Sequence, residues 1–263
     1  MKCLVISIYR IIFCRPVARK INQFLFQCAA HGLGILNYKN TKQTGEEWLV
    51  EHFLKRELKE DSVVFDVGAN KGNYMKMFLD RISCIQYYAF EPNFSAFEML
   101  QKKSKLCAAK SVTHVNAAVS SSSGQVSFYQ LDEVKACEKN TLHEEVLKGC
   151  SYSKTEVASV TLDEFTKRNE IKTIDFLKVD TEGHELQVLK GAKKLINSGN
   201  IKMIQFEFNE MNLSSRSTMR DFRKELTGYT FFRLSPYGLI LLPDLALYQE
   251  VYAFQNVFCM KKS

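Results

Sequence analysis

The chain has 263 residues, of which 46% are hydrophobic and 25% are charged. This is ordinary usage for a globular protein that can bury a full core. The net charge is +7, but residues 1–45 contain seven basic and no acidic residues, so the rest of the chain holds 29 of each. A charge excess confined to one segment argues against a general nucleic-acid binder, whose basic residues are spread over a folded face.

The cysteines and the apolar runs bear on the cellular compartment. Eight cysteines are scattered without a Cys-x-x-Cys pair, which indicates reduced thiols rather than a disulfide scaffold. No run approaches the roughly 18 apolar residues that a spanning helix needs, and the best candidate, residues 3–14, is broken by Arg10. No clear signal-peptide cleavage site follows it. We therefore expect a cytoplasmic protein, soluble or peripheral at the inner face of a membrane.

Residues 1–44 form a basic, partly apolar leader that we expect to be helical. Two glycines in segment 32–38 predict a turn at its end. The motif Thr44-Gly45-Glu46-Glu47 matches a capping box, in which the Thr and the Glu three residues later satisfy each other's free backbone N–H groups. It predicts a helix to about Leu58 and the start of a single globular domain, residues 45–263.

Apolar strands alternate with amphipathic helices from Ser62 onward. Helices are expected after Gly72 and from about Ser95, where Glu98 is the capping partner. A helix over about 186–196 stops at Gly199, and a polar helix lies near 217–226. We expect strands at 63–67, 85–90, 113–119, 125–129, 157–162, 174–179, 203–208, 229–234, 239–242 and 252–260.

This order predicts an α/β fold with a Rossmann-like, mainly parallel sheet and helices on both faces. The last strands are separated only by turns, which predicts an antiparallel C-terminal end. Residues 131–155 are polar and irregular and lie between two strands. They predict an inserted loop.

The first strand carries Asp66 near its end and runs into a glycine turn, Gly68-Ala69-Asn70-Lys71-Gly72, before a helix start at Asn73-Tyr74. Doubly wound sheets bind nucleotides at this place; the alternative is a tight structural turn. The dinucleotide spacing Gly-x-Gly-x-x-Gly is absent, which disfavours an NAD oxidoreductase. A carboxylate here repels a pyrophosphate, but it can attract the ammonium group or tolerate the sulfonium of S-adenosylmethionine.

The second strand ends in Phe90-Glu91-Pro92. A carboxylate at that strand tip can accept hydrogen bonds from both hydroxyls of a ribose, and the alternative is a solvated strand-end Glu. Together with Asp66, Gly68 and Gly72, Glu91 describes an adenosine site that does not require a phosphate.

The strand over 174–179 delivers Asp180-Thr181-Glu182-Gly183-His184-Glu185 to the same edge of the sheet. A zinc-protease motif is excluded because the fourth residue after His184 is Val188. Glu182 and Glu185 can stabilise the start of a helix, whereas Asp180, which ends an apolar strand, needs a partner. The strand over 203–208 brings Glu207 toward this edge as well.

Converging carboxylates of this kind permit two chemistries. Asp180 or His184 can act as a general base that takes the proton of an acceptor hydroxyl. Alternatively, carboxylate oxygens can hold a divalent cation that orients the hydroxyl and lowers its pKa. Both remain open, and no metal ligand is assigned. The catalytic candidates are Asp180, His184 and Glu207.

The chain resembles the FkbM family of S-adenosylmethionine-dependent methyltransferases at segments 64–72, 89–92, 116–119, 161–165, 174–185 and 204–207. The resemblance implies a seven-stranded class I methyltransferase fold with an antiparallel last strand. It also implies O-methylation of sugars or natural-product hydroxyls, with Asn116 and Ala117 near the adenine of the cofactor. The predicted cofactor-binding residues are Asp66, Gly68, Ala69, Asn70, Gly72, Asn73, Tyr74, Glu91, Pro92, Asn116 and Ala117.

We therefore predict an O-methyltransferase that uses S-adenosylmethionine to modify a hydroxyl on a sugar, a glycan or a related small molecule. The alternatives are an RNA methyltransferase and a cofactor-binding module without catalysis. A nucleic-acid partner is disfavoured because the Asn/Asp-Pro-Pro-Tyr motif of amino methylases is absent. The leader is expected to form an amphipathic helix beside the acceptor entrance, where it meets anionic lipid or the phosphate of an activated sugar; the alternative is a solvated tail. The sequence does not indicate the oligomeric state.

Overall fold

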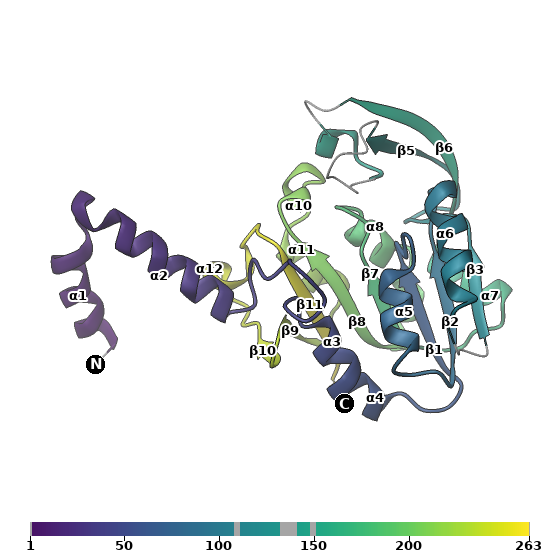
Figure 1. Cartoon of the computed structure of the whole chain (residues 1–263), viewed down its shortest axis with the longest axis horizontal. Helices are drawn as coiled ribbons and strands as arrows, with labels where there is room; N and C mark the ends of the chain where they lie inside the picture. The colour runs from purple at the N-terminus through teal and green to yellow at the C-terminus, as the bar shows by residue number, and fades with distance from the viewer. Residues whose placement is uncertain (1, 108–110, 132–140, 148–150, 263) are drawn as a thin grey trace.

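The computed structural model describes residues 2–107, 111–131, 141–147 and 151–262. A twisted eight-stranded sheet forms the centre of the body (Figure 1), in the spatial order β10-β9-β11-β8-β7-β1-β2-β3. These strands are β1 (Ser62–Val67), β2 (Ile85–Phe90), β3 (Ser111–Val115), β7 (Ile174–Val179), β8 (Ile201–Phe208), β9 (Tyr229–Ser235), β10 (Gly238–Leu241) and β11 (Gln255–Lys261).

The five strands from β3 to β8 pair in parallel, so their C-terminal ends meet at one edge. β11 is antiparallel to both β8 and β9, and β10 closes a hairpin with β9. The predicted α/β fold with a mainly parallel sheet and an antiparallel C-terminal strand is confirmed. The resemblance implied seven strands; β10 adds an eighth at the outer edge.

A second, three-stranded sheet stands apart from the first and consists of β4 (Ala118–Val119), β6 (Tyr152–Val160) and β5 (Gly124–Leu131). The prediction of one strand over 113–119 is wrong, because the chain leaves the main sheet after Val115 and Ala118–Val119 pairs with β6 instead. β6 also absorbs the end of the expected loop 131–155. The rest of that loop includes the short helix η3 (Glu144–Leu147), whereas residues 132–140 and 148–150 lie outside the described residues.

Helices cover both faces of the main sheet, and each face has its own hydrophobic core. One face carries α5 (Asn73–Leu79), α6 (Phe94–Ser104) and the helical segment α3 (Glu46–Trp48), η2 (Leu49–Leu54) and α4 (Lys55–Glu57). The opposite face carries α7 (Leu162–Arg168), α8 (Glu185–Lys190), α9 (Lys193–Asn197) and α11 (Met219–Glu225). Two further short helices, α10 (Met211–Ser214) and α12 (Ala246–Gln249), lie in connections.

The start of the first body helix differs from the predicted capping box. Its N-cap is Gly45, with φ of 84° and no side-chain capping bond, and Thr44 Oγ1 donates to Glu46 Oε2 instead. A Cβ at Gly45 would lie 2.5 Å from the carbonyl oxygen of Ser235, so only glycine allows this approach to β9. The helix also contains a π-helical stretch, η2, before it ends at Glu57.

Two other helix predictions are corrected. α6 begins at Phe94 and is capped by Asn93, whose Oδ1 accepts from Ala96 N at 2.9 Å, rather than by Ser95 with Glu98. The expected helix over 186–196 is two helices, α8 and α9, that meet at Gly191. The backbone N–H of Asp163 donates to the Gly191 carbonyl, and the Asp163 carboxylate accepts from the first residues of α9, so an external residue ends one helix and begins the next.

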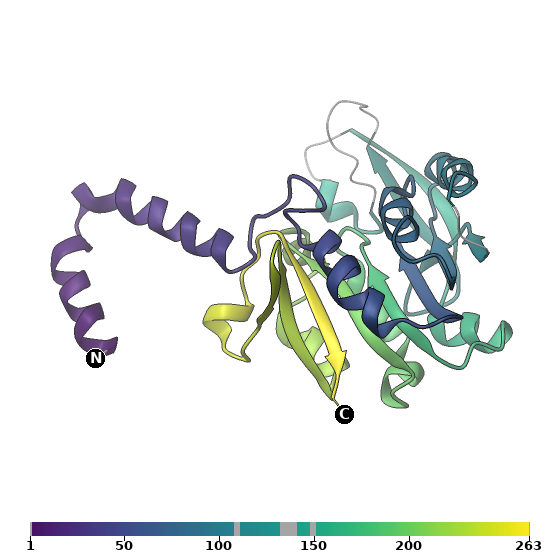
Figure 2. The ribbon, with the colours of Figure 1, turned by 60° about the horizontal axis from the view of Figure 1, so that its bottom comes forward.

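The leader forms α1 (Lys2–Phe13), a short 3₁₀ turn η1 (Pro16–Ala18) and α2 (Arg19–Gly32). It projects away from the body on the side of β10 and α12 (Figures 1 and 2). The leader joins the body just before β11, where Leu36 N donates to Phe254 O. Its expected place beside the acceptor entrance stays a prediction. Among the described helices, none combines the length and the apolarity needed to cross a membrane.

Candidate functional site

The loop between β1 and α5 turns sharply at the C-terminal edge of the sheet. Gly68 has φ of 81°, and a Cβ at this residue would lie 1.8 Å from the carbonyl oxygen of Asp180. The N–H groups of Gly68 and Ala69 both donate to Phe90 O at 3.0 Å, which ties the loop to the end of β2. Gly72, with φ of 76°, is the N-cap of α5. Both glycines of the sequence motif are therefore required by backbone geometry.

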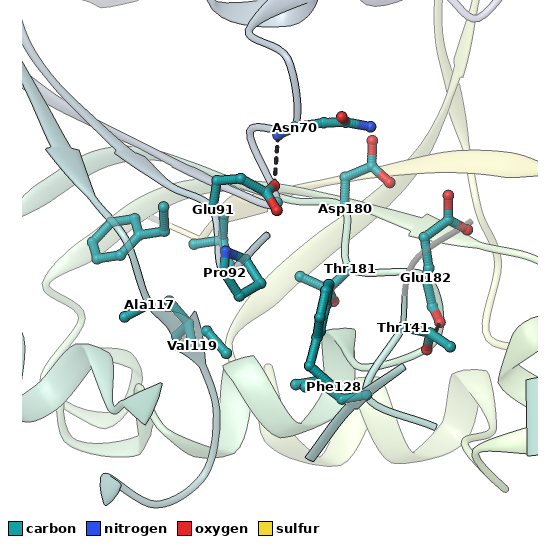
Figure 3. Close-up of a pocket in the computed structure, with 15 residues that line it drawn as sticks. Asn70, Glu91, Pro92, Ala117, Val119, Phe128, Thr141, Asp180, Thr181 and Glu182 are labelled. Carbon is teal, nitrogen blue, oxygen red and sulfur yellow. Dashed lines mark hydrogen bonds between the residues drawn. The ribbon is translucent and has the colours of Figure 1, made fainter. Parts of the chain in front are cut away.

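Glu91 directly follows β2 and points its carboxylate at this loop (Figure 3). Its Oε2 accepts from Asn70 N and its Oε1 from Asn93 N, each at 2.8 Å. Burial raises the pKa of Glu91 to about 7, although the two backbone donors act to lower it. A carboxylate with this pKa changes its charge near neutral pH.

A cavity opens beside Glu91, between the ends of β1, β2 and β7 (Figure 3). In Figure 3 the polar side chains of Asn70, Glu91 and Asp180 lie toward one side, and Val119 and Phe128 lie toward the other. The lining residues are Val67, Gly68, Asn70, Phe90, Glu91, Pro92, Ala117, Ala118, Val119, Phe128, Thr141, Leu142, Asp180, Thr181 and Glu182.

Some of the residues that line the cavity were not predicted from the sequence. Thr141 and Leu142 belong to the segment that was expected to be a loop. Thr141 forms an isolated bridge with Tyr129, and its Oγ1 donates to the Glu182 carbonyl at 2.8 Å, which brings it over the cavity. Phe128 lies on β5, whose alternation was recognised, but its partner sheet was not. The predicted residues that do line the cavity are Gly68, Asn70, Glu91, Pro92, Ala117 and Asp180.

Asp66 lies beneath the glycine loop rather than in the cavity. It is fully buried, and its Oδ2 accepts from Tyr87 OH at 2.8 Å. Lys178 Nζ, on the neighbouring strand β7, lies 3.7 Å from Asp66 Oδ1 and 3.0 Å from Asp180 Oδ2. The same ammonium group lies 4.7 Å from the centre of the Tyr74 ring. We call Lys178, Asp66, Asp180, Glu46 and Tyr74 the Lys178 cluster.

The Lys178 cluster holds one ammonium group among three carboxylates, those of Asp66, Asp180 and Glu46. Burial raises the pKa of both Asp66 and Glu46, and Lys178 opposes that shift. Burial alone acts to lower the pKa of Lys178, but the carboxylates of Asp180, Asp66 and Glu46 outweigh it and raise this pKa above its ordinary value. Lys178 is therefore a permanent buried cation that links the base of the glycine loop to Asp180.

Asp180 is the predicted catalytic residue that reaches the cavity. It directly follows β7, its backbone N–H donates to Val67 O at 2.9 Å, and its side chain keeps 35% of its surface exposed. One carboxylate oxygen is held by Lys178, as described above. This arrangement fixes the position of the Asp180 carboxylate at the cavity wall.

His184 does not line the cavity and is not placed to act as the general base. It is 8% exposed, its Nε2 lies 3.0 Å from Ser120 Oγ, and its Nδ1 lies 3.1 Å from His143 Nε2. Burial, followed by the neighbouring His143, lowers the pKa of His184 to about 3. With both ring nitrogens engaged, the neutral imidazole joins β4, the segment around His143 and the start of α8.

Glu207 lies on β8 outside the cavity lining and accepts a hydrogen bond from Asn209 Nδ2. Burial, with the nearby carboxylates of Asp180, Glu182 and Glu185, raises the pKa of Glu207 well above its usual range. Glu185 accepts from Thr181 N and Gly183 N at 3.0 and 3.1 Å, so it stabilises the turn that follows Asp180.

The other predicted cofactor residues surround the cavity without lining it. Asn116 Nδ2 donates to Glu91 O at 2.8 Å and so fixes the backbone of Glu91. Asn73 accepts a bond from Lys103 at the start of α5. Ala69 and Tyr74 are buried in the core beneath the cavity, where Tyr74 belongs to the Lys178 cluster, and Gly72 caps α5. Within the described ranges, no group of three or more His, Cys, Asp or Glu side chains has the geometry to hold a metal ion.

Residues 66–232 match the model of the methyltransferase FkbM domain. The matched region contains the glycine loop, Glu91 and Asp180 and covers more than half of the chain. The chain belongs to the FkbM methyltransferase family. The family and the methyltransferase class predicted from the sequence are thereby confirmed.

Known relatives of this FkbM chain differ in how much of it they cover. The hexuronic acid methyltransferase AglP of Haloferax volcanii is 32% identical over 161 residues, which are 61% of this chain and 62% of that protein. The plantazolicin methyltransferase BpumL, solved with S-adenosylhomocysteine, covers 95% of this chain and 92% of its own, at a TM-score of 0.46 and 11% identity. An rRNA methylase of Streptococcus thermophilus covers 82% and 95%, at a TM-score of 0.45 and 13% identity.

Proposed function

We propose that this protein transfers a methyl group from S-adenosylmethionine to a hydroxyl oxygen of a sugar or glycan. The observation that carries the proposal is the Glu91 carboxylate, which two backbone N–H groups hold at the cavity beside the glycine loop. Membership of the FkbM family supports methyl transfer. The identity of 32% to a protein named as a hexuronic acid methyltransferase favours a sugar acceptor.

The residues around the cavity fit this cofactor. Each Glu91 oxygen accepts one backbone bond and retains a lone pair, so the carboxylate can also accept from the two ribose hydroxyls. Ala117, Val119 and Phe128 offer apolar surface for a flat base. When bound, S-adenosylmethionine supplies an electrophilic methyl group on a cationic sulfur.

We propose that Asp180 is the group that orients the acceptor and receives its proton. Its partly exposed carboxylate is in the cavity wall, and the ion pair with Lys178 holds it at a fixed position. His184 and Glu207 are then positioning residues: His184 joins the segments on either side of the cavity, and Glu207 supports the turn at Asn209. Most of the rate enhancement comes from holding acceptor and methyl group in line.

The same proposal divides the chain into a catalytic domain, residues 45–263, and a leader, residues 1–44.

Whether the reaction requires a divalent cation is a question for experiment, because carboxylates near Asp180 can also serve as oxygen ligands. A chelator in the assay distinguishes the two cases: carboxylate catalysis alone predicts unchanged turnover, and a required cation predicts its loss.

The test of the acceptor is transfer of labelled methyl from S-adenosylmethionine to fractionated glycans, sugar nucleotides and RNA. We expect label in a carbohydrate fraction. Asp180→Asn keeps the shape of the site but removes the proton acceptor, so turnover should fall by about 10² or more while cofactor affinity is retained. Asp244→Asn, at an exposed carboxylate, is the matched control and should keep full turnover. Label in RNA alone, or full turnover by Asp180→Asn, contradicts the proposal.

A further inference from the structure

The leader exposes an unusual amount of apolar surface for a segment joined to a well-packed body. We call residues 2–32 the arm. Its exposed large apolar side chains have exposed fractions between 41% and 89% and are Leu4, Val5, Ile6, Ile8, Tyr9, Ile11, Ile12, Val17, Ile21, Phe24, Leu25 and Phe26. Large contiguous apolar patches on soluble proteins mark interaction surfaces, and a helix that is apolar on all sides is normally covered.

The arm is an ordered projection with a defined base. Ala30 and Ile35 are buried where it meets the body. A Cβ at Gly34 would lie 2.4 Å from the carbonyl oxygen of Leu234, so the chain passes directly against β9 at this point. Beyond the base, both helices extend away from the body (Figures 1 and 2).

The bend between the two helices is also fixed by side chains. Tyr9 OH donates to Asn22 Oδ1, and Asn22 Nδ2 donates to Phe13 O at 2.9 Å. Arg15 Nε donates to Ile11 O at 3.3 Å. The two Asn22 bonds join the end of α1 to α2 and hold the apolar side chains of both helices in one projecting unit.

The charge of the arm indicates which kind of partner covers its apolar surface. Arg10, Arg15, Arg19 and Lys20 lie on the arm, and residues 1–45 contain no carboxylate side chain to neutralise them. Packing two arms together in a dimer would bring these positive charges near each other. An anionic lipid surface instead offers phosphate groups to the bases and acyl chains to the apolar side chains.

We propose that the arm binds the surface of an anionic lipid bilayer. The apolar side chains of α1 and α2 enter the boundary between headgroups and acyl chains, and the basic residues near the bend contact lipid phosphates. The body is then held beside the membrane through the fixed base at Gly34. This proposal does not depend on methyl transfer, and its test needs neither cofactor nor acceptor.

The test is sedimentation of the full-length chain with vesicles of phosphatidylcholine alone or mixed with phosphatidylglycerol. We expect binding to the mixed vesicles that weakens when salt is raised from about 0.1 M to about 1 M, because the screening length falls from roughly 10 Å to roughly 3 Å. The double variant Arg15→Ala/Arg19→Ala should lose roughly fivefold in partition coefficient for each charge removed. Phe24→Asp should lose about tenfold or more, because it removes an inserted ring and adds a repelled charge.

Leu106→Asp is the matched control, because Leu106 is 76% exposed on the body and far from the arm in sequence. It should bind vesicles like the unmodified chain. Circular dichroism should show all variants folded, since each changed side chain is on the surface. Equal binding to neutral and mixed vesicles, or unchanged binding by Phe24→Asp, overturns the proposal. The proposal is also overturned if the chain binds no vesicles but forms a concentration-dependent dimer, and Phe24→Asp abolishes that dimer.

Discussion

Two carboxylates at the ends of neighbouring strands, Glu91 and Asp66, lie in different layers of the site. Glu91 faces the cavity, and both of its oxygens accept backbone N–H groups. Asp66 lies one layer below, fully buried, and its carboxylate meets two side-chain groups, Tyr87 OH and the Lys178 ammonium group. Similar positions in the motif therefore serve different purposes: one carboxylate is available to a ligand, and the other supports the loop.

The difference follows from what surrounds each group. Backbone donors hold Glu91 in place without neutralising its charge, so burial still raises its pKa to about 7. Asp66 shares a buried cation with Asp180 and Glu46, so its charge is part of a network. Changes in the buried layer should therefore act first on stability, and changes at Glu91 should act first on binding.

The largest effect is expected from Lys178→Met. Removing the ammonium group leaves the Asp66 carboxylate buried without its cation, which should lower the free energy of unfolding by about 3–5 kcal/mol. Urea denaturation at neutral pH measures it. Lys202→Met is the matched control, because Lys202 is 60% exposed in its ion pair with Asp175 and should cost less than about 1 kcal/mol. Equal losses of unfolding free energy in Lys178→Met and Lys202→Met would show that the buried cation contributes no more to stability than an exposed one.

Gly68→Ala should have the next largest effect. The new Cβ would meet the Asp180 carbonyl oxygen in a left-handed backbone conformation, with an expected loss of about 3 kcal/mol in stability. Gly228→Ala isolates the backbone contribution, because Gly228 has φ of 91° but no atom within 4 Å of the place that a Cβ would occupy, and should lose about 1 kcal/mol. Thermal unfolding of both variants checks the difference; identical shifts would show that the approach of loop and strand costs nothing.

A smaller effect is expected from pH. With a pKa of about 7, Glu91 is mostly protonated at pH 6, so affinity for S-adenosylmethionine should be about tenfold weaker there than above pH 8. Because this folded-state pKa of about 7 lies above the usual value of 4.5, the folded chain holds an extra proton between these two values, and Glu91 makes stability fall as pH rises from about 4.5 to about 7. Calorimetry across this range measures affinity. If Glu91→Gln keeps the same pH dependence of affinity, that dependence arises from another group.

The sequence predicted the parts of the fold that repeat a simple pattern. Apolar runs ending in Asp180 or Glu91 mark parallel strands, and the glycine spacing marks the loop between them. The sequence did not show that Ala118 and Val119 leave the main sheet, because their partner β6 lies about forty residues later, and strand pairing is not written in local alternation.

The residues that line the cavity were predicted more fully than the residues buried beneath it. Gly68, Asn70, Glu91 and Asp180 line the cavity as expected, since strand ends in a parallel sheet meet at one edge. Burial was harder to foresee: the aspartate and the histidine of the motifs, Asp66 and His184, are enclosed by partners from other strands and loops. The place where the leader meets β9 depends on the close approach of Gly34 to the Leu234 carbonyl, which no pattern in the leader encodes.

The separation of the two layers is tested most directly by titrating S-adenosylmethionine into Glu91→Gln and Asp66→Asn in a calorimeter, with the stability of each variant measured in parallel. Glu98→Gln, an exposed glutamate on α6, is the control and should match the unmodified chain. We expect Glu91→Gln to bind about 10 to 100 times more weakly in its folded fraction, since it loses charge-assisted bonds to the ribose. Its stability should fall by about 1–3 kcal/mol, because the amide nitrogen cannot accept one of the two backbone N–H groups. Asp66→Asn should lose stability but keep affinity in the folded fraction. Unchanged affinity in Glu91→Gln, together with lost affinity in a stable Asp66→Asn, would contradict the account.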